Sequence, residues 1–92
     1  MKIFKVWQEE NNNYDTYDSF VVVTTDAARA KDIRPSWQNN SGIETVNWDN
    51  PDLQNKDIHC LWARHRYAVY VEYLGESDSE VEQIVCASFN AG

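Results

Sequence analysis

The stretch Tyr67-Ala68-Val69-Tyr70-Val71-Glu72-Tyr73-Leu74 is the clearest strand of this chain. It is rich in β-branched and aromatic residues, and the alternation of side chains along a strand places every second residue, from Tyr67 to Tyr73, on one face. We expect Gly75 to end this strand. The acidic run Glu76–Glu82 is then expected to form a solvated hairpin turn, from which Ile84–Phe89 pairs back as the last strand.

Two further strands are expected near the start of the chain. Residues 3–8 mix apolar and basic positions, residues 9–18 form a polar, acidic loop, and Ser19–Thr24 is the second strand. The four consecutive apolar residues Phe20–Val23 indicate burial on both faces and therefore a central place in the sheet. The two strands are predicted to pair as an antiparallel hairpin with a long loop.

A short helix is expected to follow over Ala27–Ile33, because most of these residues favour helices and Thr25 or Asp26 can cap its start. Pro35 should stop the helix, since the residue before a proline is driven out of the helical region.

The middle of the chain carries weaker signals. Residues 36–57 combine turn residues with scattered apolar ones, which predicts a packed irregular segment. The apolar spacing over residues 58–65 fits one stripe of a helix, but the run is short and could also be extended. The sequence therefore predicts a single domain over residues 1–92 of the α+β class, with a four-stranded, mainly antiparallel sheet and one or two short helices on one face.

Composition narrows the classes of function. The 92 residues are 42% hydrophobic and carry a net charge of −7. This charge argues against a protein whose whole surface embraces duplex DNA or an anionic membrane. No apolar run approaches the ~20 residues of a membrane span, and the opening residues do not resemble a signal peptide. We therefore expect a soluble cytoplasmic protein with no membrane partner.

Catalytic and metal chemistry find little support in the residues. A zinc site could be imagined from His59, Cys60, His65 and Cys86, but the adjacent His59 and Cys60 point their side chains apart in any regular structure. Cys86 is better interpreted as a small core residue on a strand. Three glycines leave no glycine-rich phosphate loop. We expect no enzyme activity, no cofactor and no metal.

Binding chemistry is better represented, in three places. Arg64-His65-Arg66-Tyr67 interleaves basic and aromatic residues as nucleic-acid-binding proteins do, although a solvated strand edge would look the same. A basic helix face formed by Arg29, Lys31 and Arg34 lies near Trp37, although the ordinary outer face of an amphipathic helix would look the same. A polar loop precedes the second strand, and long loops often carry function. The candidate partner-binding residues are Asn11, Asn12, Asn13, Asp15, Arg29, Lys31, Arg34, Trp37, Arg64 and Arg66.

Two motifs carry a resemblance to known proteins. Tyr14-Asp15-Thr16-Tyr17-Asp18-Ser19-Phe20-Val21-Val22 and Cys86-Ala87-Ser88-Phe89-Asn90-Ala91-Gly92 resemble segments of a group of small proteins common in tailed-phage genomes. In its length and its opening, the chain also resembles phage anti-CRISPR proteins that act on type I-F systems, specifically their eighth inhibitor group. Residues 36–62 differ most from the general sequence plan of the tailed-phage group.

The resemblance implies a phage protein that works by binding, in the cytoplasm of the infected bacterial host. Its implied partner is the type I-F crRNA-guided surveillance complex. The resemblance implies contact with the Cas proteins, leaves direct contact with the crRNA open, and implies that binding blocks capture of target DNA. No catalytic residue carries over. The alternative is a phage accessory protein that binds nucleic acid, or mimics DNA toward another host enzyme.

Overall fold

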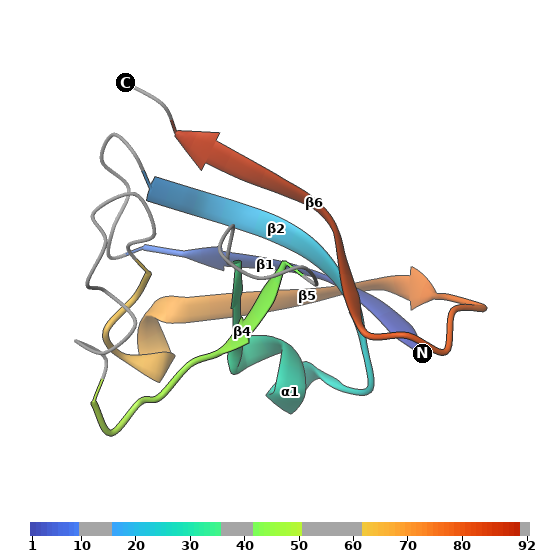
Figure 1. Ribbon diagram of the computed structural model, residues 1–92, viewed down its shortest axis with the longest axis horizontal. Helices are drawn as coiled ribbons and strands as arrows, with labels where there is room; N and C mark the ends of the chain where they lie inside the picture. The colour runs from blue at the N-terminus through green and yellow to red at the C-terminus, as the bar shows by residue number, and fades with distance from the viewer. Residues whose placement is uncertain (10–15, 36–41, 51–61, 91–92) are drawn as a thin grey trace.

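Four antiparallel strands form the main sheet, in the order β5-β1-β2-β6 (Figure 1). The computed structural model describes residues 1–9, 16–35, 42–50 and 62–90. The bounds of the four strands are β1 Lys2–Gln8, β2 Thr16–Thr24, β5 Val69–Glu76 and β6 Gln83–Asn90. In these residues one short α-helix and a second, two-stranded sheet accompany the main sheet, which confirms the predicted α+β class.

The predicted hairpin of the first two strands is confirmed. β1 and β2 pair antiparallel from Lys2 opposite Thr24 to Trp7 opposite Ser19. β2 lies between β1 and β6, as its apolar run predicts, and Val22 and Val23 are both buried although they point to opposite faces. The strand begins at Thr16, three positions earlier than expected, because its backbone continues to pair with β6.

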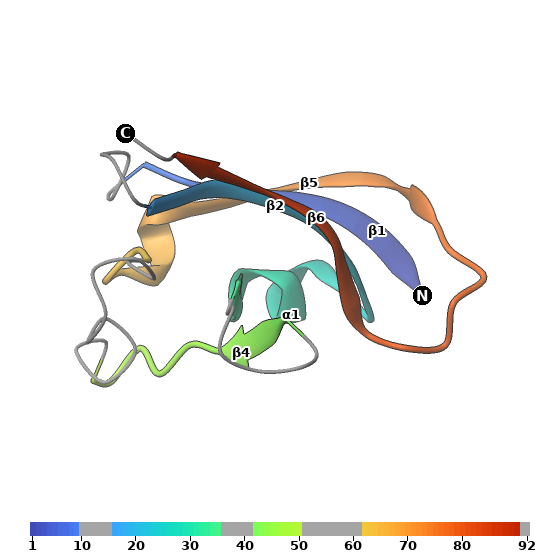
Figure 2. The same cartoon turned by 45° about the horizontal axis from the view of Figure 1, so that its top comes forward.

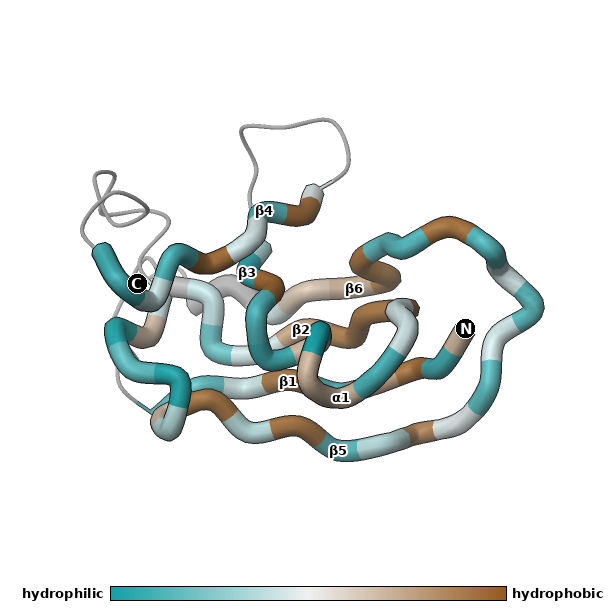
Figure 3. The backbone as a smooth tube through the Cα atoms, turned by 90° about the horizontal axis from the view of Figure 1, so that it is seen from below, coloured by the Kyte–Doolittle hydropathy of each residue, from teal (hydrophilic) through white to brown (hydrophobic). Residues whose placement is uncertain are grey.

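The expected hairpin between the last two strands is wrong. β6 pairs with β2, whereas β5 pairs with β1, so the two strands occupy opposite edges of the sheet. The doubly buried β2 needs a neighbour on each side, and β6 supplies the second one. The intervening connection runs around the end of the sheet (Figure 3). Met1 holds it there: the Ser77 N–H donates to the Met1 carbonyl at 2.8 Å, and the Met1 amino group donates to the Ser77 carbonyl at 3.1 Å.

The bounds of β5 also differ from the prediction. Arg66–Ala68 form a turn of 3-10 helix, η3, so the strand starts at Val69 instead of Tyr67. It then continues through Gly75 to Glu76, because a register shift beside Ile3 and Phe4 allows β5 to stay paired with β1.

Beneath the sheet lies the helix α1, Ala27–Lys31 (Figure 2). Asp26 caps it by accepting the Arg29 N–H at 2.8 Å. The helix is two residues shorter than expected and ends at the C-cap Asp32. Ile33–Pro35 instead form strand β3, because the residue before a proline favours extended backbone.

β3 pairs with strand β4, Ile43–Thr45, in the small second sheet. β4 lies within the segment that was expected to be irregular. The Val46 N–H then donates to the Asp32 carbonyl at 2.8 Å, so this segment is tied to the end of α1.

The core fills the space between the main sheet and the layer of α1 and β3. The centres of the Phe20 and Trp62 rings lie 5.4 Å apart in this space, and both side chains are buried. The helical stripe predicted over residues 58–65 is not formed at its described end. Residues 62–65 are not helical, and His65 is exposed whereas Trp62 is buried. The buried cluster is Phe4, Val6, Phe20, Val22, Ala30, Ile33, Val46, Trp62, Ala63, Ala68 and Val69.

The other face of the sheet is not covered by α1. On this face the Trp7 and Tyr70 rings stack with 5.7 Å between their centres, and the Lys5 ammonium lies 5.6 Å from the centre of the Trp7 ring. Cys86, which was expected in the core, is exposed on the edge strand β6.

Candidate binding groove

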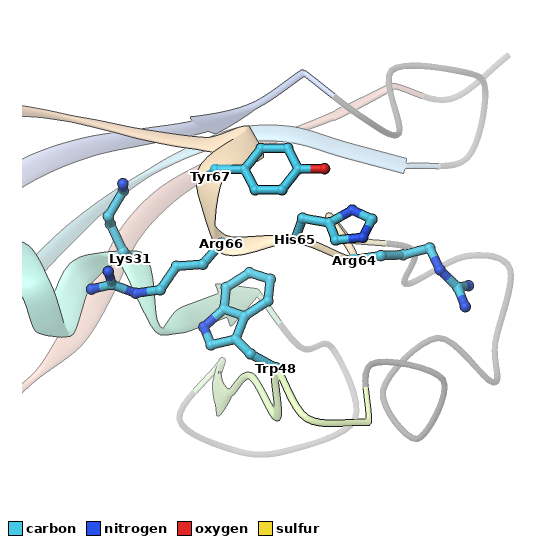
Figure 4. Close-up of a pocket in the computed structure, with 6 residues that line it drawn as sticks. All are labelled: Lys31, Trp48, Arg64, His65, Arg66 and Tyr67. Carbon is cyan, nitrogen blue, oxygen red and sulfur yellow. The ribbon is translucent and has the colours of Figure 1, made fainter.

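A hollow of about 460 Å³ lies where η3 meets the end of α1 (Figure 4). The close-up shows Lys31 and Arg66 on one side, Arg64 on the other, and aromatic rings between them. We call this hollow the basic groove. Its lining residues are Lys31, Trp48, Arg64, His65, Arg66 and Tyr67.

Asp32 holds two sides of the basic groove together. Its Oδ1 accepts a hydrogen bond from Arg66 Nε at 3.0 Å and another from Trp48 Nε1 at 2.9 Å. Arg66 Nη2 also donates to the Ala28 carbonyl at 3.3 Å, which provides a partner for a carbonyl near the end of α1. The helix end therefore orients both the Trp48 indole and the Arg66 guanidinium.

The aromatic part of the basic groove comes from the chain around η3. The His65 and Tyr67 rings stack with 5.0 Å between their centres and an angle of 16° between their planes. Tyr67 is 76% exposed, so most of its surface is available to a partner. An exposed aromatic pair beside a partly buried indole is a surface that planar groups can stack on.

The basic groove is positive although the chain is negative. Among the side chains that the structure describes here, Lys31, Arg64 and Arg66 contribute three positive charges, Asp32 removes one, and His65 is counted as neutral, so this set carries about +2. The exposed carboxylates of the β5–β6 connection lie at the opposite end of the molecule (Figure 1). The Debye length of about 8 Å at physiological salt lets the two ends act separately.

The structure brings together three of the predicted site residues, Lys31, Arg64 and Arg66. Arg29 lies elsewhere: its guanidinium donates to both Glu82 carboxylate oxygens at 3.0 and 2.8 Å, and to Thr45 Oγ1 at 3.0 Å. Most of its hydrogen-bonding capacity is therefore used within the molecule.

The expected placement of Arg34 on an outer helix face is wrong. α1 ends before it, and Arg34 lies in β3 with its side chain 1% exposed and its Nε 4.0 Å from Glu44 Oε2. A side chain this buried is not available to a partner in this conformation. Asn11, Asn12, Asn13, Asp15 and Trp37 lie outside the residues that the structure describes.

Sequence reasoning did not select four residues of this site. His65 and Tyr67 lie within the basic and aromatic motif, so their pattern was visible, but only its arginines were chosen. Trp48 and Asp32 meet through tertiary packing, and no local spacing in the sequence indicates that contact.

The Arg29–Glu82 ion pair predicts a pH dependence of stability. Hydrogen bonds from Arg29 lower the pKa of the Glu82 carboxyl below its ordinary value of 4.5. A carboxyl whose pKa is lowered by folding stabilises the protein above its unfolded pKa, and this stability is lost as the pH falls through the folded pKa. Glu82→Gln should therefore lower the free energy of unfolding by about 1 kcal/mol at pH 7 and by much less at pH 3.

Urea unfolding of both proteins at the two pH values measures this difference. Glu80→Gln, at an exposed position of the same connection, is the control and should change little. An equal effect of Glu82→Gln at pH 7 and at pH 3 would show that the stabilisation does not come from the ionised Glu82 carboxylate beside Arg29.

Within the described residues, no three His, Cys, Asp or Glu side chains gather as a metal site requires. In the same residues, no helix combines the length and the apolar character needed to span a bilayer. Comparisons with protein-family models, with curated proteins and with solved structures found no match.

Proposed function

We propose that this protein is a phage-encoded anti-CRISPR inhibitor that binds the type I-F crRNA-guided surveillance complex and blocks its capture of target DNA. It acts by occupying a surface, makes and breaks no covalent bond, and works in the cytoplasm of the infected bacterium. The proposal starts from the resemblance of the two sequence motifs and the opening of the chain to phage proteins of this kind.

The observation that carries the proposal furthest is the separation of charge. The basic groove and the acidic β5–β6 connection, with exposed Glu76, Asp78 and Glu80, lie at opposite ends of the molecule (Figure 1). An RNA-guided complex presents the same two signs side by side, because its guide RNA lies along channels rich in lysine and arginine. A protein with one positive end and one negative end is complementary to such a surface, and its net negative charge is steered toward the basic channel that DNA would enter.

The size of the domain is compatible with this role. Its accessible surface is 5391 Å². A stable protein interface covers about 800 Å² on each partner, which is about a seventh of that surface. An interface of this size would leave about six sevenths of the surface outside the contact, and that remainder can obstruct an approaching DNA duplex.

Co-elution with the purified type I-F surveillance complex tests the proposal. In size-exclusion chromatography, the protein is expected to shift into the fractions of the complex. The isolated mixture should then fail to retard a labelled target duplex in a gel. A duplex bound as well with saturating protein as without it would exclude inhibition of target capture.

The same experiment separates the alternative function. A phage accessory protein directed at nucleic acid or at another host enzyme would not co-elute with the surveillance complex, and the complex would bind its target duplex as before.

A further inference from the structure

We infer that a second hollow, on the face of the main sheet that α1 does not cover, receives an arginine side chain of a partner protein. This hollow has a volume of about 380 Å³. The inference rests on the proposed function only for the identity of the partner, and it names the side chain that the partner would insert. We call this site the outer hollow, and its lining residues are Lys5, Trp7, Gln8, Glu9, Asp18 and Ser19.

The outer hollow arises from a large side chain beside a small one. Val6 and Gln8 are buried on the core side of β1, so the alternation of the strand places Trp7 on the uncovered face. On β5, Trp7 lies opposite Tyr70, and the two rings stack. On β2, it lies opposite Ser19, whose side chain is too small to fill the space beside an indole. The Trp7 ring therefore has an aromatic neighbour on one side and open space on the other.

An irregularity in β2 brings a carboxylate into this space. Tyr17 pairs with Phe89 of β6. The next pair along the ladder is Ser19 with Ser88, so Asp18 is skipped. A β-bulge of this kind re-aims the side chain of the extra residue. Asp18 accordingly lines the outer hollow, where its Oδ1 accepts the Ser19 hydroxyl at 3.3 Å.

The outer hollow is negative. Glu9, just past the end of β1, adds a second exposed carboxylate, so the described lining side chains carry two negative charges and the one positive charge of Lys5. Within the described part of the chain, the Glu9 side chain has no hydrogen bond or ion pair, and the Asp18 side chain has only the Ser19 hydroxyl. Both carboxylates can therefore accept N–H groups from an incoming cation.

The Trp7 ring already attracts a cation in the free protein. The Lys5 ammonium lies 5.6 Å from the centre of the ring, within the distance of about 6 Å at which this attraction acts. Lys5 also lies opposite Glu72 on β5, and both side chains are exposed. The ammonium can therefore turn toward Glu72 when another cation reaches the ring.

This combination of groups favours a guanidinium. A guanidinium is flat, so it can stack on an indole while the N–H groups at its edge bond carboxylates, whereas an ammonium is a point charge that does both less well. Glu9 and Asp18 repel phosphate and carboxylate groups. RNA-guided complexes carry arginine along the channels that hold their nucleic acids, so the proposed partner can supply the side chain.

An NMR titration of the isolated, full-length chain tests the inference. The probe is acetyl-glycyl-arginyl-glycinamide, and the same tripeptides with lysine and with citrulline are compared with it. The arginine peptide should shift the Trp7 indole N–H and the Ser19 amide signals, with a dissociation constant in the millimolar range, because few contacts offset the cost of association. The lysine peptide should bind more weakly. Citrulline has nearly the shape of arginine but no charge, so its peptide should leave both signals in place.

Three variants assign the binding to the outer hollow. Glu9→Gln combined with Asp18→Asn should weaken arginine binding about two- to thirtyfold, the range for two exposed ion pairs. Trp7→Leu, followed through the Ser19 amide, should weaken it about two- to fivefold. Lys5→Met keeps the apolar stem but removes the competing ammonium, so it should tighten binding by a similar factor.

Asp78→Asn combined with Glu80→Gln is the matched control for the carboxylate variant. It makes the same two chemical changes at exposed positions of the β5–β6 connection. Arginine binding by this control should equal that of the unmodified chain.

The variants are then measured against the surveillance complex. Glu9→Gln combined with Asp18→Asn should weaken binding of the protein to the complex at least twofold, and Lys5→Met should not weaken it. The inference is overturned if the arginine peptide leaves the Trp7 signal in place, if citrulline binds as tightly, or if the carboxylate variant binds the complex as tightly as the unmodified chain. In each of these cases co-elution and inhibition by the unmodified chain would leave the proposed function standing, whereas arginine binding without co-elution would overturn the proposed function and, with it, the partner named here.

Discussion

Phe20→Ala is expected to lower the free energy of unfolding by about 3–5 kcal/mol, the range for removing a buried phenyl ring. Phe20 is 2% exposed, lies on the central strand β2 and packs against the buried Trp62. Small domains have total stabilities of about 5–15 kcal/mol, so the loss is a large fraction of the whole. The variant should unfold at a much lower urea concentration and should be partly unfolded at 37 °C.

Val85→Ala provides the comparison, because Val85 is 61% exposed on the edge strand β6. Its unfolding midpoint should remain close to that of the unmodified chain. If Phe20→Ala were as stable as Val85→Ala, the packing of β2 against Trp62 described above would be incorrect.

Lys31→Gln combined with Arg64→Glu should weaken binding to the surveillance complex at least tenfold. The two changes turn the net charge of the basic groove from about +2 to about −1, and they alter side chains at its rim. Affinity can be measured as binding of the protein to surface-immobilised surveillance complex. Inhibition can be measured as the protein concentration that halves binding of the target duplex. Circular dichroism should show a folded domain.

Arg66 is left unchanged in this variant on purpose. Its guanidinium bonds Asp32 and the Ala28 carbonyl, so a substitution there would disturb the end of α1 as well as the groove. Lys2→Gln combined with Lys5→Glu is the control, since it changes the total charge equally on two exposed positions of β1. If both double variants inhibit as well as the unmodified chain, the basic groove is not part of the interface with the surveillance complex.

The sequence predicts the centre of the sheet well but not its edges. The apolar run Phe20–Val23 indicates a strand buried on both faces, and β2 is such a strand. The segment Ile84–Phe89 was predicted to be a strand, but nothing in its residues indicates which neighbour it pairs with. Proximity along the chain favoured a hairpin with β5, whereas the open side of β2 required β6 as its partner.

Helix length shows a similar limit. Pro35 and the cap Asp26 were both visible, but the helix ends at Lys31, earlier than the proline requires. The pairing of β3 with β4 extends the chain from Ile33 onward, and β4 lies ten residues further along. Such a contact competes with helix propensity and has no local signature.

The candidate site is predictable where its residues are adjacent in sequence. Arg64 and Arg66 were selected from one basic and aromatic motif, and both line the basic groove. Trp48 and Asp32 come from separate segments and meet only in the folded chain. Arg34 was misplaced because a cationic side chain is ordinarily solvated, whereas β3 is buried at all three of its positions.

Titration of the type I-F surveillance complex with the purified protein measures the central claim most directly. At a complex concentration well above the dissociation constant, binding of labelled target duplex should fall in proportion to added protein and reach its floor at a fixed whole-number ratio. Removing the protein by dilution and washing should restore DNA binding to the same complex. Loss of DNA binding at a small fraction of the complex concentration, or loss that persists after the protein is removed, would contradict inhibition by occupancy.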